Sequence, residues 1–384
     1  MKKLLLGLGL AAVFGLVQAQ SSVTVYGILD AGYIGSNYKG TGTSTTNKQT
    51  TSAFGSSAET PSRLGLQGSE DLGGGTSAFF TVETGLIPTG STASTWNNRQ
   101  SFVGIKQAGI GQVAVGTQYT PIFNAIVLTD PGKANDVVGS VLFPSSPQAW
   151  GNSGTAPYAQ PTSSAGTSDA FTVRTSNTLT ATTDNFNGLV GTAMYTLNNQ
   201  NSTQTDATTG GTNNASGYGF GVNYTYQKLL LSANYQSLKS QQTGTLTNPT
   251  PALWTGSTGG VNTQDNQTYI AGTYDFGILK AYAGWINRKA TDTINSGYYA
   301  SRSAQQIGVR GFWTPTIESW ASIGNGAVKT YGTGQPTYNF TGYQLGSNYY
   351  LSKRTNLYAI FGSTQTSTID VSANSYALGI KHTF

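Results

Sequence analysis

The chain has 384 residues, and only 9% of them are charged, whereas about a quarter are charged in a typical soluble domain. It has no cysteine and one histidine, which excludes thiolate metal sites, disulfide frameworks and most histidine-based catalysis. The formal net charge of +5 is too small and too dispersed to indicate a nucleic-acid surface.

The first residues have the three parts of a secretory signal peptide. Two lysines precede an apolar core over residues 4–17, and a small-x-Ala cleavage site ends at Ala19. The apolar core is too short to cross a bilayer as a helix. We therefore predict an exported chain with a signal peptide at residues 1–19 and one mature domain at residues 20–384.

Most of the mature chain alternates between apolar and polar positions. In the segment SVTVYGILDAGYI, Val23, Val25 and Leu29 share one parity, while Thr24 and Asp30 share the other. No window shows a helical period of 3.6, and no run reaches 18 apolar residues. This pattern predicts β-strands with one apolar and one polar face, without transmembrane helices.

The connections between these strands alternate between short and long. The short ones fall at residues 71–75, 107–112, 183–188, 226–228, 275–277, 313–316 and 351–356. The long ones are rich in Ser, Thr, Asn and Gly and fall near 35–60, 87–98, 120–168, 198–216, 239–263, 289–301, 330–338 and 365–373. The rhythm leaves room for about sixteen strands of ~9–11 residues.

A soluble β-sandwich does not favour this rhythm and would keep more surface charge. In lipid, however, a sheet must close so that no backbone group stays unpaired. We therefore predict an all-β fold: a transmembrane, antiparallel, up-and-down β-barrel of about 16 strands. Short turns would face the periplasm and long loops the exterior, and a barrel of this size encloses water.

Several motifs then carry a recognisable resemblance. The segments SRLGLQGSEDLGGGTSAFFTVETG (62–85), NRQSFVGI (98–105), YYLSKRTNLYA (349–359) and YALGIKHTF (376–384) resemble the trimeric general porins of the Gram-negative outer membrane. The nearest branch looks like the anion-preferring one, which carries an arginine ladder on the pore wall. The resemblance implies a homotrimer of sixteen-stranded barrels, with the third long loop (120–168) folded into the lumen as the constriction.

The same resemblance points to residues of the pore wall. Arg63 in SRLG, Arg99 in NRQ and Arg174 in VRTSN each resemble a ladder arginine of the family. Arginine suits this role because it stays charged and offers a rigid fork of donors. Where the family usually has Gly-Arg-Gln, this chain has Gly-Thr-Gln at 116–118, so we expect one wall charge to be missing.

Acidic groups are expected to face these arginines. Asp30 and Glu83 alternate with apolar residues of their strands and so should point into the lumen. The long third loop adds Asp130, Lys133 and Asp136, and loops of this length are usually functional or disordered. Acids opposite an arginine wall would set a transverse field across the constriction. The plainer alternative is that the arginines only pair with neighbouring carboxylates.

The C-terminus closes an alternating apolar face that includes Tyr376 and ends on Phe384. The resemblance implies that the barrel-insertion machinery reads this end as an assembly signal. The one histidine, His382, lies on the parity of Phe384. Since the chain has no GxSxG stretch either, we expect no enzyme, and no cofactor or metal site.

The sequence hypothesis is therefore an outer-membrane channel for passive diffusion of small hydrophilic solutes and ions, with a weak anion preference. Its other partners would be outer-membrane lipid and lipopolysaccharide. Two alternatives stay open: a porin specific for one solute class, and an adhesin or phage receptor built on the long loops.

Overall fold

The structure is a computed structural model that describes residues 22–41, 44–90, 98–144, 170–202, 211–242, 263–293, 297–332, 337–367 and 371–384. The signal peptide predicted at residues 1–19 lies outside them. Within these ranges no helix has the length and apolar character needed to cross a membrane.

The elements are β1 (Ser22–Thr41), β2 (Ser44–Ser56), β3 (Arg63–Gly73), β4 (Thr76–Gly85), β5 (Asn98–Gln107), β6 (Gly111–Tyr119), α1 (Pro121–Thr129), β7 (Arg174–Thr183), β8 (Leu189–Ser202), β9 (Gly211–Tyr226), β10 (Leu229–Gln242), β11 (Thr263–Asp275), β12 (Lys280–Asp292), β13 (Tyr299–Thr314), β14 (Ile317–Tyr331), β15 (Tyr338–Tyr350), β16 (Thr355–Thr366) and β17 (Ser372–Thr383).

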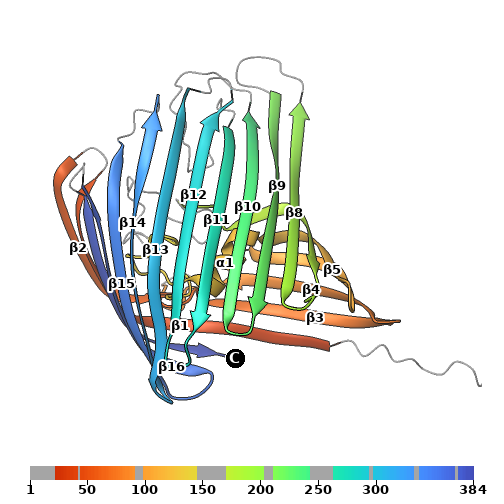
Figure 1. The fold of residues 1–384 in the computed structure, drawn as a ribbon, viewed down its shortest axis with the longest axis horizontal. Coiled ribbons are helices and arrows are strands. Elements are labelled where there is room, and N and C mark those ends of the chain that lie inside the picture. Colours follow the sequence, from red (N-terminus) through yellow and green to blue (C-terminus); the bar gives the residue numbers. More distant parts are fainter. Residues whose placement is uncertain are drawn as a thin grey trace, which may run out of the picture.

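The strands form one antiparallel sheet that closes on itself (Figure 1). Each strand from β3 onward pairs with the next, and β17 pairs with β1 over Ile28–Lys39. On its other side, β1 pairs with β2 over residues 31–41 and with β3 over residues 22–28. Because β2 and β3 follow one another along the same side of β1, they are two halves of one broken strand. The sheet therefore has sixteen spanning strands, which confirms the predicted barrel.

The carboxyl-terminal residue takes part in closing the barrel, where its last strand meets its first. Phe384 and Gly27 exchange two backbone hydrogen bonds of 3.1 Å each. A Cβ at residue 27 would lie 2.4 Å from the ring of Phe384, so the ring needs glycine there. Tyr376 and Phe384 both point outward and are exposed on the apolar face.

The seven predicted short turns are confirmed, but one predicted long loop is wrong. We expected residues 35–60 to form a loop, yet β1 continues to Thr41 and β2 occupies Ser44–Ser56. Backbone pairing needs no apolar side chains, so strands continue beyond the apolar belt into polar sequence. The predicted loops at 198–216 and 239–263 are shortened for the same reason by β8, β9 and β10.

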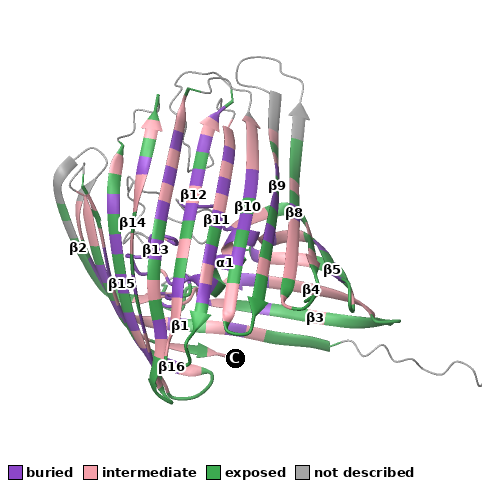
Figure 2. Cartoon of the chain, in the orientation of Figure 1, coloured by how far each residue is buried: buried purple, intermediate pink, exposed green. Residues whose placement is uncertain are grey.

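Burial alternates most regularly along β11–β16, as Figure 2 shows. In β15, for example, buried Gln344 and Gly346 alternate with exposed Tyr343 and Leu345. The polar member of each pair faces inward and the apolar member outward, which is the reverse of a soluble protein. Only a barrel that sits in lipid and holds water or polar groups inside explains that polarity.

The barrel has two walls of different height (Figure 1). Strands β3–β7, here called the short wall, have 9–11 residues. Strands β8–β17, here called the tall wall, have 12–16 residues. The loop-side ends of the short wall therefore lie lower on the barrel than those of the tall wall.

The third long loop folds into the barrel, as predicted, over its described residues 120–144. It begins with α1, whose start is capped by Thr120: the hydroxyl accepts from Phe123 N–H (3.4 Å) and Pro121 follows at the first helical position. The helix packs against the inner face of β8–β12. An apolar cluster joins Ile122, Ile126 and Leu142 of the loop to Tyr269 and Ile286 of the tall wall.

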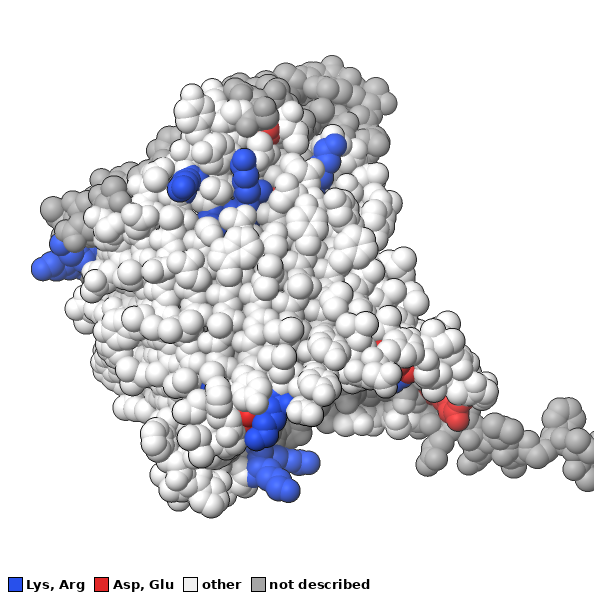
Figure 3. Space-filling model, viewed as in Figure 1, with Lys and Arg blue, Asp and Glu red and all other residues white. Residues whose placement is uncertain are grey.

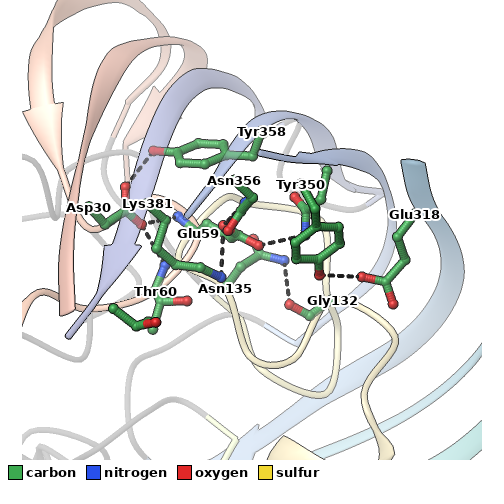
Figure 4. Close-up of polar contacts among 12 residues, drawn as sticks. Asp30, Glu59, Thr60, Gly132, Asn135, Glu318, Tyr350, Asn356, Tyr358 and Lys381 are labelled. Carbon is green, nitrogen blue, oxygen red and sulfur yellow. Dashed lines mark hydrogen bonds and ion pairs between the residues drawn. The ribbon is translucent and has the colours of Figure 1, made fainter. Parts of the chain in front are cut away.

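The break between β2 and β3 is held by a buried carboxylate (Figure 4). Asp30 Oδ2 accepts from the backbone N–H groups of Glu59 (2.9 Å) and Thr60 (2.7 Å), and Oδ1 accepts from the Tyr358 hydroxyl (2.6 Å). Ser57, which opens the break, has a φ of 70°. Asp30 thus supplies acceptors for backbone donors that the interrupted strand cannot pair.

Replacing Asp30 should destabilise the barrel at this break. In Asp30→Ala, two backbone N–H groups and one hydroxyl lose their acceptor, which should lower the free energy of unfolding by about 3 kcal/mol. Urea unfolding in lipid vesicles, followed by tryptophan fluorescence, measures this change. Tyr358→Phe removes only one of the three bonds and should cost about 1 kcal/mol. Equal midpoints for Asp30→Ala and the wild type would contradict the assignment.

Candidate functional site

The three predicted arginines lie together at the loop-side rim of the short wall. Arg63 opens β3, Arg99 is the second residue of β5 and Arg174 opens β7. The register of β4 with β5 shifts beside Arg99, and that of β6 with β7 shifts between Gly116 and Gln118. Such bulges redirect side chains, and here they occur where the arginines converge.

Glu83 on β4 is the centre of this arginine cluster. Arg99 Nε donates to Glu83 Oε1 at 2.8 Å, and Arg63 Nη1 lies 3.6 Å from the same oxygen. The Tyr26 hydroxyl donates to the other carboxylate oxygen at 3.1 Å. The side chains of Glu83 and Arg99 are only 2% and 4% exposed. Glu83 therefore binds the arginines together and does not itself line the water-filled space.

Arg63 and Arg174 are the more accessible members of the cluster. Arg63 donates from Nε to the Pro61 carbonyl at 2.9 Å, and its side chain keeps 17% exposure. Arg174 is half-buried, donates to the Arg99 carbonyl at 3.4 Å and lies 5.7 Å above the ring of Tyr119. The Tyr119 hydroxyl in turn accepts from Arg99 Nη2 at 2.8 Å. Two positive charges thus lie at one carboxylate of this rim, and a third, on Arg174, lies beside Arg99 and Tyr119.

Asp130 fixes the infolded loop to the wall. Its carboxylate accepts from Gln306 Nε2 (2.8 Å), from the Ala134 N–H (2.9 Å) and from the Ser140 hydroxyl (3.4 Å). Burial raises the pKa of this carboxyl, and the three hydrogen bonds act against that rise. Because Asp130 is 1% exposed, it anchors the loop and does not reach the lumen water, contrary to our expectation.

Lys133 and Asp136 are the loop charges that remain open to the lumen. Lys133 is exposed and Asp136 is partly exposed. The Asp136 N–H donates to the Ala58 carbonyl at 3.0 Å, which ties the loop to the break between β2 and β3. Enclosure inside the barrel raises the pKa of the Asp136 carboxyl to about 7; Arg99 and Arg63 act to lower it, and Asp30 adds to the rise. Asp136 is therefore electrostatically coupled to the arginine rim.

Asp30, like Asp130, was expected to line the lumen but is buried. It points inward, as its parity indicates, but it is 0% exposed because the break at 57–62 covers it. The neighbouring acid, Glu59, accepts from Asn348 (2.8 Å) and Asn356 (2.9 Å) and pairs with Lys381 at 3.0 Å (Figure 4). Both carboxylates are thus held by protein donors.

Sequence reasoning missed the residues of β13 that hold the loop. Arg302 Nη2 donates to the Val141 carbonyl (2.8 Å), and Arg310 Nη1 donates to the Pro131 carbonyl (2.7 Å). Gln306, midway between them, accepts from the Val141 N–H at 2.9 Å. All three share the inward parity of β13, so the alternation could have found them. On β15, Gln344 accepts from Asn135 of the loop at 2.6 Å and so also fixes the loop to the wall.

The comparisons with known proteins agree with this geometry. The family model of the Gram-negative porins matches residues 8–368. An outer membrane porin protein of Bordetella pertussis is 28% identical over an alignment of 422 positions that covers all of both chains. The major outer membrane protein P.IB of Neisseria gonorrhoeae is 35% identical over 143 residues, which are 37% of this chain and 39% of the length of that protein.

Solved structures show the same fold at low sequence identity. An anion-selective porin from Comamonas acidovorans superposes with a TM-score of 0.70 at 21% identity, covering 95% of this chain and all of that one. The trimer form of OmpT, an outer membrane protein of Vibrio cholerae, gives a TM-score of 0.62 at 14% identity, covering 95% and 99%. With the closed barrel and the family match together, the chain is an outer-membrane protein that belongs to the Gram-negative porin family.

Proposed function

We propose that the protein is a passive channel for small hydrophilic solutes and ions, with a weak preference for anions. The observation that carries the proposal is the arginine rim, where Arg63 and Arg99 lie at a single acid, Glu83, and Arg174 adds a third cation beside Arg99. Across from it, the loop presents exposed Lys133 and one coupled acid, Asp136. Positive charge therefore exceeds negative charge at the level where the infolded loop narrows the barrel.

The fold of an anion-selective relative supports the sign of this preference. The threonine at position 117, where the family usually has arginine, supports its weakness, because it removes one charge from the same rim. Stepwise conductance of the purified protein in a planar bilayer tests the channel itself. Conductance that saturates with one solute would instead identify a solute-specific porin, and no conductance would overturn both.

The accessible arginines should control selectivity, and the buried one should control stability. Arg63→Gln with Arg174→Gln should lower the anion-to-cation permeability ratio by about two- to fivefold, because a unit charge a few ångströms away is worth about 1 kcal/mol in water. The zero-current potential in a salt gradient measures this ratio. Arg99→Gln should instead destabilise the barrel, because it leaves the buried Glu83 without its closest charge partner. An unchanged ratio in the double variant would contradict the arginine role.

Selectivity should also change with pH through Asp136. Because its pKa is about 7, the carboxyl is mostly charged at pH 8 and mostly neutral at pH 6. Lowering the pH should therefore make the rim more positive and raise the anion-to-cation permeability ratio. The measurement is the zero-current potential at both pH values, and Asp136→Asn should abolish the change. His382→Gln is the matched control, since this side chain lies on the outward parity; loss of the pH effect in this variant would contradict the assignment.

Assembly as a homotrimer is part of the same proposal. The trimer form of the OmpT structure supports it, as do the exposed apolar residues on the outer face of the short wall, among them Leu64, Leu66, Val103 and Val115. Native mass spectrometry of detergent-purified protein should give three chains per complex. Replacing Val103 and Val115 by lysine should give single chains, and trimers in that variant would show that the short wall is not the interface.

A further inference from the structure

The helix of the infolded loop presents an apolar surface inside the barrel. One side of α1 is buried against the inner face of β8–β12. On the other side, Val127 and Leu128 are 39% and 49% exposed, and Phe123 is partly exposed. At 3.6 residues per turn, these three residues fall within less than half of the circumference of the helix. We call them the apolar stripe.

The bilayer explains exposed apolar residues on the outer face of the barrel, but it does not explain the apolar stripe. Figure 3 shows a broad band of that outer face without charged side chains, and exposed residues such as Phe220 and Val222 of β9 lie on the outer face. The helix lies inside the closed sheet (Figure 1), where lipid does not reach it. A group of exposed apolar residues that lipid does not cover usually marks a binding site.

The arginine rim lies at the start of the apolar stripe. Arg174 and Tyr119 are direct partners in the register of β6 with β7, and the guanidinium carbon lies 5.7 Å from the centre of the Tyr119 ring. The Tyr119 ring is in turn 4.5 Å from the ring of Phe123, centre to centre. The Thr120 N–H donates to the Val173 carbonyl at 3.0 Å, which holds the start of the helix beside Arg174. A cation and the stripe are therefore separated by a single aromatic ring.

The surroundings of the stripe favour an anion. The nine residues of α1, PIFNAIVLT, include no charged side chain. Asp130, which follows the helix, is 1% exposed and bonded within the protein, whereas Lys133 is exposed. Asp136 is partly exposed, but it lies at the break between β2 and β3, away from the strands that α1 contacts. A negatively charged solute on the stripe would thus find cations beyond both ends of the helix.

We propose that the apolar stripe and the arginine rim bind small aromatic carboxylates, anions of the benzoate type. The ring of the solute packs on Phe123 and on the side chains of Val127 and Leu128, which extend over about 7.5 Å of helix. The carboxylate accepts from the guanidinium of Arg174, whose planar fork matches a carboxylate. An aromatic solute fits better than an aliphatic one because Phe123 and Tyr119 offer ring contacts as well as apolar area.

This inference rests on the proposed channel and names one class of solute that it retains on the path. The site is weak, so chloride and other anions still pass. Chloride conductance without an aromatic solute should therefore stay proportional to the salt concentration.

Block of the chloride current in a planar bilayer tests the proposal, with sodium benzoate as the probe. Benzoate at millimolar concentrations should reduce the wild-type current in a saturable manner. Cyclohexanecarboxylate has the same charge and a similar size without the aromatic ring, and it should need about a fivefold higher concentration for half-block. Benzamide, which keeps the ring without the charge, should not block. Equal half-blocking concentrations for the two carboxylates would overturn the proposal.

Variants locate the site. Phe123→Leu keeps an apolar side chain and removes the ring, so the half-blocking concentration of benzoate should rise about fivefold while that of cyclohexanecarboxylate changes little. The matched control, Phe220→Leu, removes an exposed ring on the outer face and should leave both values unchanged. Arg174→Gln should weaken block by both carboxylates about fivefold. Val127→Ser with Leu128→Ser should also weaken both; unchanged block in that variant would show that another part of the chain covers the stripe, and would overturn the proposal.

The wild type alone separates failure of this site from failure of the channel. Chloride conductance with an anion preference, but without any effect of benzoate, would reject the aromatic-carboxylate site and keep the channel. No conductance at all would reject both. If Phe123→Leu does not fold, as judged by circular dichroism, the comparison of benzoate with cyclohexanecarboxylate on the wild type still decides.

Discussion

The structure depends on one constraint: within hydrocarbon, every backbone N–H and C=O must find a partner in the chain. The sheet meets this requirement by pairing β17 with β1 and by the reciprocal bonds of Phe384 with Gly27. Closure then fixes which side of each strand faces lipid and which faces the interior. The alternation in the sequence, the low charge and the inward polar side chains all follow from this requirement.

Closure leaves the chain free to depart from regular pairing only where water or protein covers the backbone. Three of the departures, the break at 57–62 and the bulges beside Arg99 and Gly116, lie toward the loop-side rim of the short wall; the other register shifts lie beside two short turns and near the end of β1. At each of the three, a side chain or a nearby backbone group replaces lost ladder bonds. Asp30 does so at the break, and Gln118 does so near Gly116 by donating to the Thr178 carbonyl at 2.9 Å. The irregular positions of this rim are therefore the ones at which polar groups converge on the inside of the barrel.

The alternation of apolar and polar residues, with the rhythm of short and long connections, was enough to predict the barrel, its strand number and the inward direction of Asp30 and Glu83. It could not show that other protein groups cover Asp30 and Asp130, because that depends on contacts between segments far apart in the chain. Asp30 meets Tyr358 across 328 positions of sequence, and Asp130 meets Gln306 across 176. For the same reason, the sequence did not reveal the roles of Gln344 and of the arginines of β13. Their inward direction could be predicted from the alternation in their strands. Their partner, the infolded loop, has no such alternation, so its contacts with them could not be predicted.

These contacts divide the inward charges into two kinds. Three cations that lie on the tall wall, Arg288, Arg310 and Lys381, each pair with one acid, namely Asp265, Glu318 and Glu59, at 2.6–3.0 Å. Such pairs mainly offset the cost of burying their own charges, so they hold the wall and loop in place and leave little field in the lumen. The arginine rim does not balance in this way, because Arg63 and Arg99 share Glu83 and Arg174 adds a third cation bonded to the Arg99 carbonyl. In the proposed channel, the field that a passing ion meets would therefore arise mainly from the arginines of the short wall. The contacts of the tall wall with the loop would then determine how far the loop narrows the path.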